Sequence, residues 1–545
     1  MSDLTIDRTA EAYGYPLTIK QLLLDAVNRF PEQEIVYADK LRLTYRQMGD
    51  RVGQLASGLS SLGVKPGDTV AVMDWDTHRY LECFYGIPMM GAVLHMVNVR
   101  LSPEQVLYTI NHAQDDVILC NVEFLPLLEA IQDRIETVKK IVVLSDDGTT
   151  PETKVQIDAE YEALLAKSDP GFEFPELDED TRATTFYTTG TTGNPKGVYF
   201  SHRQLVLHTV GSRLESTGAA HGTMGPDDVY MPITPMFHVH AWGVPYVASS
   251  LGVKQVYPGR YVPDALLELM RREKVTFSHC VPAILQMLFA SPKLEEMDLS
   301  NWKVIIGGSA LPPALCKQGL EMGIDIFSGY GMSETCPILT MAHLTSEMLE
   351  WDIDRQVEQR CKAGRPAPMV QLRIADDDLN FMPHDGKSQG EVVVRAPWLT
   401  QGYLHDDENS RKLWRGGWLH TGDIGVIDPD GYLRITDRIK DVIKTGGEWL
   451  SSIELEGLIL EHPKVAESAV VGIPDQRWGE RPLAMVVPNP GQEIDPEEIK
   501  QFLSGYVEDG TLPKYGIPER VLVVSEIPKT SVGKINKKEI RSEYS

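Results

Sequence analysis

The sequence predicts an α/β protein with a large N-terminal domain of layered α/β subdomains, a β-rich subdomain and a small α+β C-terminal domain. The chain has 545 residues, several times the typical length of one domain, ~150 residues, so more than one hydrophobic core is expected. Strand-like apolar runs alternate with amphipathic segments through the first half of the chain, which is typical of α/β layers. The pattern changes near Arg365 and again near Asp437, which indicates the other two parts.

The elements of the N-terminal layers are predicted from apolar runs and helical periodicity. We expect strands at residues 69–73, 117–120, 141–144 and 304–306. We expect amphipathic helices at residues 19–30 and 265–273. From about residue 365 to 434, short alternating runs at 391–395 and 432–435 are separated by glycines, and Asp430-Gly431 predicts a hairpin turn.

The C-terminal region has a mixed pattern. Ser451 followed by Glu454 is a candidate capping box for a helix through Leu460. Strands are expected at 468–471, 483–487 and 520–524, and a helix at 496–503. We therefore predict an N-terminal domain over 1–436, a short hinge at 437–440 and a C-terminal domain over 441–545.

The amino-acid composition limits the kinds of molecule that the chain is expected to bind and the compartment in which it is expected to work. The chain has 52 basic and 78 acidic residues and a net charge of -26, which disfavours nucleic acid and anionic lipid. The apolar stretch 86–99 is short and interrupted by Pro88 and His95, so no stable membrane insertion is expected. The six cysteines are scattered, and the polar start at residues 1–10 does not resemble a signal peptide. These features predict a cytoplasmic protein.

The strongest local signal is Tyr187-Thr-Thr-Gly-Thr-Thr-Gly-Asn-Pro-Lys-Gly197. Its glycines allow backbone N–H groups to approach a polyphosphate, its threonines add hydroxyl donors, and Lys196 adds a positive charge. The candidate phosphate-binding residues are Thr188, Thr189, Gly190, Thr191, Thr192, Gly193 and Lys196. The pattern is not a P-loop, because the lysine follows proline and precedes glycine. The alternative is a flexible surface loop.

A second signal is Ser328-Gly-Tyr-Gly-Met-Ser-Glu334. Tyr330 could stack on a purine base, while the Glu334 carboxylate coordinates a Mg²⁺ ion that bridges phosphates. The alternative is a turn with a solvated glutamate. The candidate nucleotide-binding residues here are Gly329, Tyr330, Gly331, Met332 and Ser333.

Two further segments carry charge. Asp423 follows a tight turn and could accept hydrogen bonds from ribose hydroxyls, and Arg438 could donate to ribose or phosphate. Lys534 follows a glycine turn near the C-terminus and could offset transition-state charge. Taken one at a time, the alternatives are a solvated charge run and a lysine-rich tail.

The order and separation of these motifs resemble the adenylate-forming, AMP-binding superfamily of acyl-CoA synthetases, and the chain is similar to bacterial medium- and long-chain fatty acyl-CoA ligases over nearly its whole length. The resemblance rests on the motifs above together with Met236-Phe-His-Val-His-Ala-Trp242, Gly307-Gly-Ser-Ala310 and Gly446-Gly-Glu-Trp449. It implies the adenylate-forming enzyme fold.

The resemblance implies a role for each matching residue. ATP phosphates would lie on 188–196, Mg²⁺ near Thr188 and Glu334, and the ribose on Asp423 and Arg438. Adenine would lie against Tyr330 and the backbone of Gly308, Ser309 and Ala310. The implied catalytic residues are Lys534, Glu334, Lys196 and His238. The implied acyl pocket contains His238, Trp242, Gly308 and Gly331. The implied hinge and CoA path contain Lys440, Lys444, Gly446, Gly447, Glu448 and Trp449.

The implied reaction has two halves. The carboxylate of an organic acid attacks the α-phosphorus of ATP and releases pyrophosphate, and the CoA thiol then attacks the acyl-adenylate and releases AMP. Lys534 would assist the first half and leave before the second, by rotation of the C-terminal domain at Lys440. The implied partners are therefore a small-molecule carboxylic acid, ATP and CoA.

His238, His240 and Trp242 allow several interpretations. His-x-His on one strand face could bind a metal, but no third ligand is evident. By resemblance, His238 and Trp242 line the acyl pocket, with Trp242 as a gate; the alternative is core packing. His240 and Ser333 depart from the asparagine and threonine often found there, so the substrate does not carry over from relatives.

The motifs leave the substrate and several other protein classes open. The acid could be a medium- or long-chain fatty acid, a short sulfur-containing acid such as 3-methylmercaptopropionate, or a cyclic or aryl acid. From other classes, we considered an adenylation partner of a separate carrier protein, a luciferase-like oxygenase and a non-catalytic nucleotide-binding module. Because the sequence ends eleven residues after Lys534, we expect no fused carrier domain. A homodimer through the large domain is a further expectation.

Overall fold

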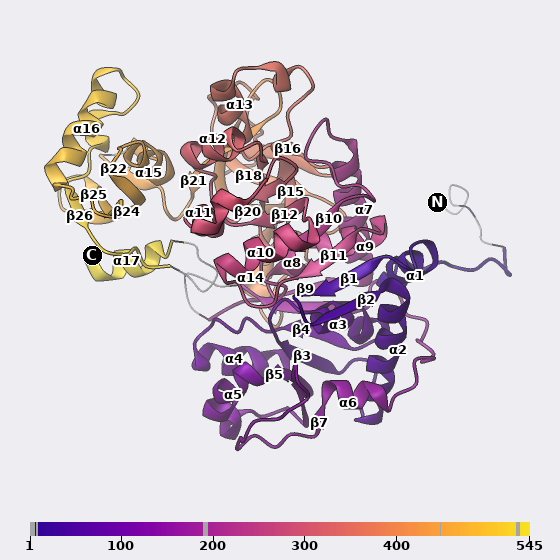
Figure 1. The fold of residues 1–545 in the computed structure, drawn as a ribbon. Helices are drawn as coiled ribbons and strands as arrows, with labels where there is room; N and C mark the ends of the chain where they lie inside the picture. The colour runs from indigo at the N-terminus through magenta and orange to yellow at the C-terminus, as the bar shows by residue number, and fades with distance from the viewer. Residues whose placement is uncertain (1–5, 7–8, 189–193, 447, 530–534, 545) are drawn as a thin grey trace.

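The computed structural model describes residues 6, 9–188, 194–446, 448–529 and 535–544. Its four sheets are arranged as a large α/β part with a β-rich sheet and a smaller C-terminal part to one side (Figure 1). This confirms the predicted fold class. The two largest sheets belong to the α/β part.

The first sheet has the strand order β7-β6-β5-β3-β4-β8-β9. All neighbouring strands are parallel except β8 and β9, which form an antiparallel pair. The strands are β3 (Thr69–Met73), β4 (Val93–Met96), β5 (Val117–Asn121), β6 (Lys140–Leu144), β7 (Ala159–Glu160), β8 (Arg182–Tyr187) and β9 (Gly197–Ser201). The associated helices are α3 (His78–Met89), α4 (Pro103–Ala113), α5 (Leu125–Ile131) and α6 (Tyr161–Ala166).

The second sheet has the order β16-β15-β14-β13-β12-β10-β11-β1-β2. Its strands are β1 (Glu34–Tyr37), β2 (Leu41–Thr44), β10 (Val229–Pro232), β11 (Lys254–Tyr257), β12 (Phe277–Cys280), β13 (Lys303–Ile306), β14 (Asp325–Gly331), β15 (Ile338–Met341) and β16 (Arg365–Pro366). Its longer helices are α1 (Ile19–Arg29), α2 (Tyr45–Ser61), α7 (His202–Gly218), α9 (Val244–Leu251), α10 (Pro263–Glu273), α11 (Pro282–Phe289), α12 (Pro313–Glu321) and α13 (Ile353–Arg360). The first strands of the chain thus complete the second sheet.

Helix α3 joins the two sheets. It packs against β1 of the second sheet and against β4 and β8 of the first, and all of its residues are buried. The apolar stretch 86–99 is therefore the end of this core helix followed by β4. No helix in the described part of the chain is long and apolar enough to cross a bilayer.

The β-rich sheet contains β17 (Gln371–Ala375), β18 (Gly390–Arg395), β19 (Trp414–Arg415), β20 (Trp418–Ile427) and β21 (Leu433–Arg438), with α14 (Asp407–Leu413) beside it. Strands β20 and β21 are antiparallel, and Gly431 has a φ of +84° in the loop between them. The predicted hairpin at Asp430-Gly431 is confirmed, because this left-handed conformation favours glycine.

The C-terminal part has its own sheet and its own hydrophobic core. It comprises β22 (Ile443–Thr445), β23 (Glu448–Leu450), α15 (Ser452–Leu460), β24 (Val465–Asp475), β25 (Gly479–Pro488), α16 (Pro496–Glu508), β26 (Arg520–Val523) and α17 (Lys537–Tyr544). The Ser451 hydroxyl caps α15 by accepting from the Glu454 N–H at 3.0 Å, which is one half of the predicted capping box, while the Glu454 carboxylate pairs with Arg434. Strand β21 continues through Arg438, and residues 439–442 form the turn that follows it.

Candidate active site

The antiparallel strands β8 and β9 bring the two ends of the threonine-glycine loop together. The Thr188 N–H donates to the Lys196 carbonyl at 2.9 Å, and the Lys196 N–H donates to the Thr188 hydroxyl at 3.2 Å. Thr188 and Lys196, the two ends of this segment, therefore lie side by side. The predicted residues Thr189, Gly190, Thr191, Thr192 and Gly193 lie outside the described residues.

Tyr403, which lies in none of the sequence motifs, contacts both Lys196 and Glu334. The Lys196 ammonium lies 4.6 Å from the centre of the Tyr403 ring, and the Tyr403 hydroxyl donates to Glu334 Oε1 at 2.7 Å. Burial and the neighbouring Glu334 raise the pKa of Tyr403, so the phenol stays protonated and remains a donor. Glu334 itself is only 7% exposed. A buried carboxylate, a phenol and an ammonium thus adjoin the loop.

Tyr330, Asp423 and Arg438 form a second hydrogen-bonded group. The Tyr330 hydroxyl donates to Asp423 Oδ2 at 2.7 Å, and the Arg438 Nε–H donates to Asp423 Oδ1 at 3.1 Å. Strands β20 and β21 place Asp423 directly opposite Arg438. The Asp423 charge raises the pKa of Arg438, while burial and Asp423 raise that of Tyr330. The structure therefore brings together three residues predicted for one nucleotide.

Glycines allow close backbone approach at the carboxyl ends of β13 and β14. A Cβ at Gly331 would lie 1.8 Å from the Pro337 carbonyl oxygen, so no side chain fits there. Gly308 has a φ of +79°, and Gly308, Ser309 and Ala310 are exposed after β13. Because β13 and β14 are parallel, these residues share one edge of the sheet with Gly329, Tyr330, Met332 and Ser333.

The segment 236–242, which we call the acyl segment, has an unexpected backbone. Val239, His240, Ala241 and Trp242 have φ values of 49°, 57°, 47° and 59°, so α8 (Val239–Trp242) is a left-handed turn. This conformation costs L-residues roughly 1–2 kcal/mol each. The expectation that His238 and His240 share one strand face is therefore wrong. Tertiary contacts must hold the strained turn in place.

The acyl segment is held mostly by aromatic rings and uncharged side chains. His240 is fully buried, its Nε2 lies 2.8 Å from the Thr184 hydroxyl, and burial lowers its pKa to about 3. The Trp242 ring stacks on His279 with 5.0 Å between ring centres. A Cβ at Gly307 would lie 2.9 Å from the Trp242 ring, so the indole packs directly against this glycine. His238, predicted for catalysis and the acyl pocket, is half-buried at the start of the turn.

A buried carboxylate anchors the start of the acyl segment. The Met236 N–H donates to Asp76 Oδ1 at 2.8 Å, and the Tyr261 hydroxyl donates to Asp76 Oδ2 at 2.5 Å. Asp76 is 3% exposed, and burial raises its pKa to about 7. Asp76 follows β3 of the first sheet, whereas Met236 follows β10 of the second. The contact therefore joins the two sheets behind the site.

The predicted hinge and CoA-path residues lie at the start of the C-terminal part. Lys440 is exposed in the turn after β21, and Lys444 lies on β22. Gly446 has a φ of +64° and donates its N–H to the Trp478 carbonyl at 2.7 Å. Glu448 and Trp449 belong to β23, which pairs with β22. Gly447 and Lys534 lie outside the described residues.

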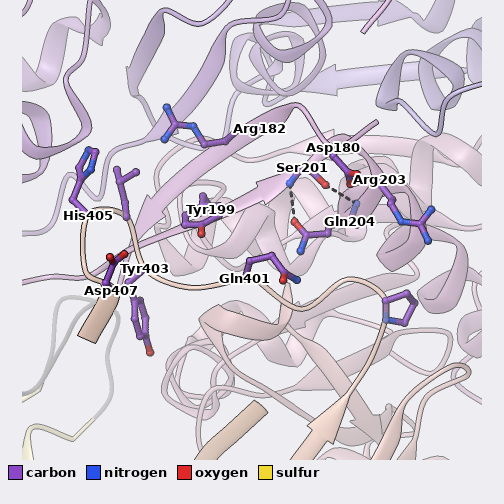
Figure 2. Close-up of a pocket in the computed structure, with 12 residues that line it drawn as sticks. Asp180, Arg182, Tyr199, Ser201, Arg203, Gln204, Gln401, Tyr403, His405 and Asp407 are labelled. Atoms are coloured by element: carbon purple, nitrogen blue, oxygen red, sulfur yellow. Dashed lines mark hydrogen bonds between the residues drawn. The ribbon is translucent and has the colours of Figure 1, made fainter. Parts of the chain in front are cut away.

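A separate cavity of 630 Å³ adjoins the site (Figure 2). Its lining includes Arg182 and Arg203 together with Asp180 and Asp407, so both signs of charge face it. Among the described residues that line it, Tyr403 belongs to the site and none is a residue predicted from the sequence. Among the described residues, no group of three or more histidine, cysteine, aspartate or glutamate side chains is arranged to hold a metal ion.

Known proteins match this chain over nearly its whole length. The family described as AMP-binding enzyme matches residues 23–404, and its C-terminal domain matches residues 454–534. The chain is 41% identical over 508 residues to the long-chain-fatty-acid–CoA ligase of Thermus thermophilus, covering 92% of this chain and 90% of the relative. It is 38% identical over 503 residues to the 3-methylmercaptopropionyl-CoA ligase of Ruegeria pomeroyi, covering 91% of each. It is 34% identical over 535 residues to the medium-chain-fatty-acid–CoA ligase of Ectopseudomonas oleovorans, covering 97% and 96%.

Solved structures show the same architecture. The anthranilate CoA ligase AuaEII in complex with anthranoyl-AMP has a TM-score of 0.85 and 25% identity, covering 98% of this chain and 99% of that one. ATP-bound MatB from Rhodopseudomonas palustris has a TM-score of 0.83 and 26% identity, covering 97% and 99%. The resemblance inferred from the motifs is confirmed, and the chain belongs to the AMP-binding enzyme family.

Proposed function

We propose that the protein is an ATP-dependent, AMP-forming acyl-CoA ligase that converts a carboxylic acid into its CoA thioester. The observation that carries this proposal is that two groups of side chains adjoin, since the charge of Glu334 in one group helps raise the pKa of Arg438 in the other. Lys196, Tyr403 and Glu334 adjoin the phosphate loop, and Tyr330, Asp423 and Arg438 adjoin the glycine-rich edge of β13 and β14. Relatives named as CoA ligases, which match over nearly the whole chain, support it.

In this proposal the chain binds ATP across both groups. Asp423 and Arg438 orient the ribose, the exposed backbone after β13 and the Tyr330 ring hold the base, and the Thr188–Lys196 end of the loop holds the phosphates. The substrate carboxylate forms a bond to the α-phosphorus, and the bond from that phosphorus to the pyrophosphate oxygen breaks. Lys196 and Lys534 offset the charge on the phosphoryl oxygens and on the leaving pyrophosphate.

The residues present are compatible with Mg²⁺, which relatives of this type imply. Mg²⁺ usually takes one or two protein carboxylates and completes its shell with water and substrate phosphates. Glu334 offers one buried carboxylate and Thr188 one hydroxyl. When bound there, the ion would neutralise phosphate charge. Tyr403 holds Glu334 in position through its hydrogen bond, and this orientation comes from the chain itself.

The second half requires the CoA thiol to reach the acyl carbonyl. We propose that the thiol attacks this carbon and that AMP leaves as the C–O bond to phosphate breaks. Gly446, with its left-handed backbone, Gly447 and the start of β23 would provide the path for the pantetheine chain. Rotation at 437–440 would remove Lys534 and bring this path to the site, with 1–436 and 441–545 as the moving domains.

For the acid, we propose a medium- or long-chain fatty acid, with 3-methylmercaptopropionate as the second candidate. The Thermus and Ectopseudomonas relatives support the first, and the Ruegeria relative supports the second. The tight packing of Trp242 against Gly307 supports the second candidate, the short sulfur-containing acid. A cytoplasmic location and a homodimer complete the proposal.

The deciding experiment offers the purified protein ATP, Mg²⁺, CoA and a panel of acids from C2 to C18, with thioether and aromatic acids included. We expect acid-dependent release of AMP and pyrophosphate and formation of a CoA thioester. Oxygen label from the acid's carboxylate should appear in AMP. Release of ADP, or label that never reaches AMP, would exclude the proposed mechanism, and the acid with the highest kcat/KM identifies the substrate class.

A further inference from the structure

Helix α17 begins at Lys537, three residues after Lys534 in the sequence. Lys529 and Ile535 form an antiparallel bridge, and the Asn536 N–H donates to the Pro528 carbonyl at 2.8 Å. These contacts bring residues 528–529 beside residues 535–536, on either side of the segment 530–534, which lies outside the described residues. Since α17 starts at Lys537, any contact that fixes this helix also fixes the base of the lysine loop.

Lys537 enters a buried polar group. Its ammonium donates to the Ser452 hydroxyl at 2.7 Å and pairs with Glu456 Oε1 at 2.7 Å. The Ser452 hydroxyl lies 3.0 Å from Asp437 Oδ1, and the Ser452 N–H donates to Asp437 Oδ2 at 2.5 Å. Ser452 and Asp437 are 0% and 1% exposed. Burial raises the pKa of Asp437 and of Glu456, and the charge of Lys537 opposes both rises.

This group crosses the predicted hinge. Asp437 belongs to β21 of the β-rich sheet, whereas Ser452 and Glu456 belong to α15 of the C-terminal part. One turn further along α17, Arg541 pairs with Asp441. The two basic residues are four positions apart, so they share one face of the helix. Arg541 thus pairs with Asp441, just after residues 438–440, and Lys537 is linked to Asp437, just before them, through the Ser452 hydroxyl.

We infer that Lys537 and Arg541 are positioning residues that couple the turn at 438–442 to the loop carrying Lys534. Rotation about this turn would separate Asp437 from Ser452 and so remove part of the buried group that holds Lys537. Removing one partner from a buried charged group is unfavourable, so the turn and the lysine loop should change position together. The inference deepens the proposed function and rests on it, because it concerns the use of Lys534 in the first half-reaction.

The test compares Lys537→Met with Lys538→Met. The control removes the neighbouring, exposed lysine, whose side chain lies outside the buried group. Hydrogen exchange is measured on peptides that cover 438–442, 528–540 and, as an internal reference, the paired strands β24 and β25. In Lys537→Met we expect about tenfold faster exchange at the first two peptides and no change in the reference strands. The amides of Asp441 and Val442, which both donate to the Arg438 carbonyl, report on the turn.

The half-reactions provide the second measurement. Lys537→Met should slow acyl-adenylate formation about tenfold to a hundredfold, while thioester formation from supplied acyl-adenylate changes less than twofold. Lys537→Arg, which keeps the charge, should restore most of the rate. If Lys537→Met does not fold, Arg541→Gln tests the same coupling through the more exposed ion pair with Asp441.

Unchanged exchange at 438–442 in a folded Lys537→Met protein would overturn the inference, as would equal loss in both half-reactions. Faster exchange throughout β24 and β25 would also overturn it, because the lysine would then only stabilise the domain. Hydrogen exchange does not depend on catalysis. If the wild-type protein formed no AMP while the exchange result held, the proposed function would fail and the coupling would stand.

Discussion

The proposed nucleotide side of the site and the acyl segment hold their side chains in different ways. On the nucleotide side, charged and phenolic groups from separate strands orient one another, as in the pairing of Asp423 with Tyr330 and Arg438. On the acyl side, His240 and His279 are buried and burial lowers the pKa of both, the Trp242 and His279 rings stack, and the backbone is strained over 239–242. In the proposed function, charge placement would therefore organise the reacting phosphates, whereas packing would organise the acid. Each prediction below should therefore affect one side and spare the other.

The largest effect is expected for Lys534→Ala. Loss of one preorganised positive charge should slow acyl-adenylate formation by about 10² to 10³, or roughly 2.7–4 kcal/mol. Thioester formation from supplied acyl-adenylate should be nearly unchanged. Pyrophosphate release and thioester formation are measured separately in single-turnover experiments. Equal losses in the two halves would contradict a role confined to the first.

Asp423→Asn should have the next largest effect. The asparagine amide is neutral, so its hydrogen bond from Arg438 loses the negative charge of the carboxylate acceptor. Hydrogen bonds to charged groups contribute roughly 1.5–3 kcal/mol. We expect kcat/KM for ATP to fall about tenfold to a hundredfold. The relative preference among acids should remain the same. A changed acid preference would show that the two sides are not independent.

Trp242→Ala changes the acyl side and leaves the nucleotide side intact. Removing the indole opens the space between Gly307 and His279, so longer or wider acids should gain relative to short ones. We expect the ratio of kcat/KM between long and short acids to rise about tenfold. The KM for ATP should stay within about twofold of wild type. An unchanged ratio would indicate that Trp242 only packs the core.

The smallest effect on the reaction is expected at Asp76, the carboxylate that anchors the acyl segment, whose titration acts on stability instead. Burial raises its pKa to about 7, so protonation favours the folded state. Its contribution to stability is complete below the ordinary aspartate pKa and is lost as the pH rises from about 4 to about 7. The loss amounts to at most about 1.4 kcal/mol per pH unit.

Asp76→Asn is neutral at every pH and should lack this decline. The Tm is measured from pH 5 to pH 8 for wild type, for Asp76→Asn and for Asp377→Asn as an exposed control. The wild type and the control should lose stability toward pH 7 more steeply than Asp76→Asn. Parallel Tm curves for all three proteins would show that Asp76 does not titrate in this range.

Several parts of the fold and site could be predicted because their chemistry is local. The apolar runs located β3 over the observed residues, and Asp430-Gly431 located a hairpin, since each depends on neighbours in the sequence. Tyr330, Glu334 and Lys196 were selected because their motifs combine glycines with charged or aromatic residues. Tyr403 was missed because it lies in no such motif, and its role depends on Glu334, 69 residues away.

The sequence by itself determined the order of the elements, the charged residues of the nucleotide side and the family. It did so because these follow from periodicity, turn residues and motif spacing. Only the tertiary structure decided the left-handed turn at 239–242, because no local propensity favours four non-glycine residues in that conformation. The contacts of the acyl segment with Asp76, Thr184 and His279 come from the segment after β3 and from strands β8 and β12, and they supply the energy that the local sequence lacks.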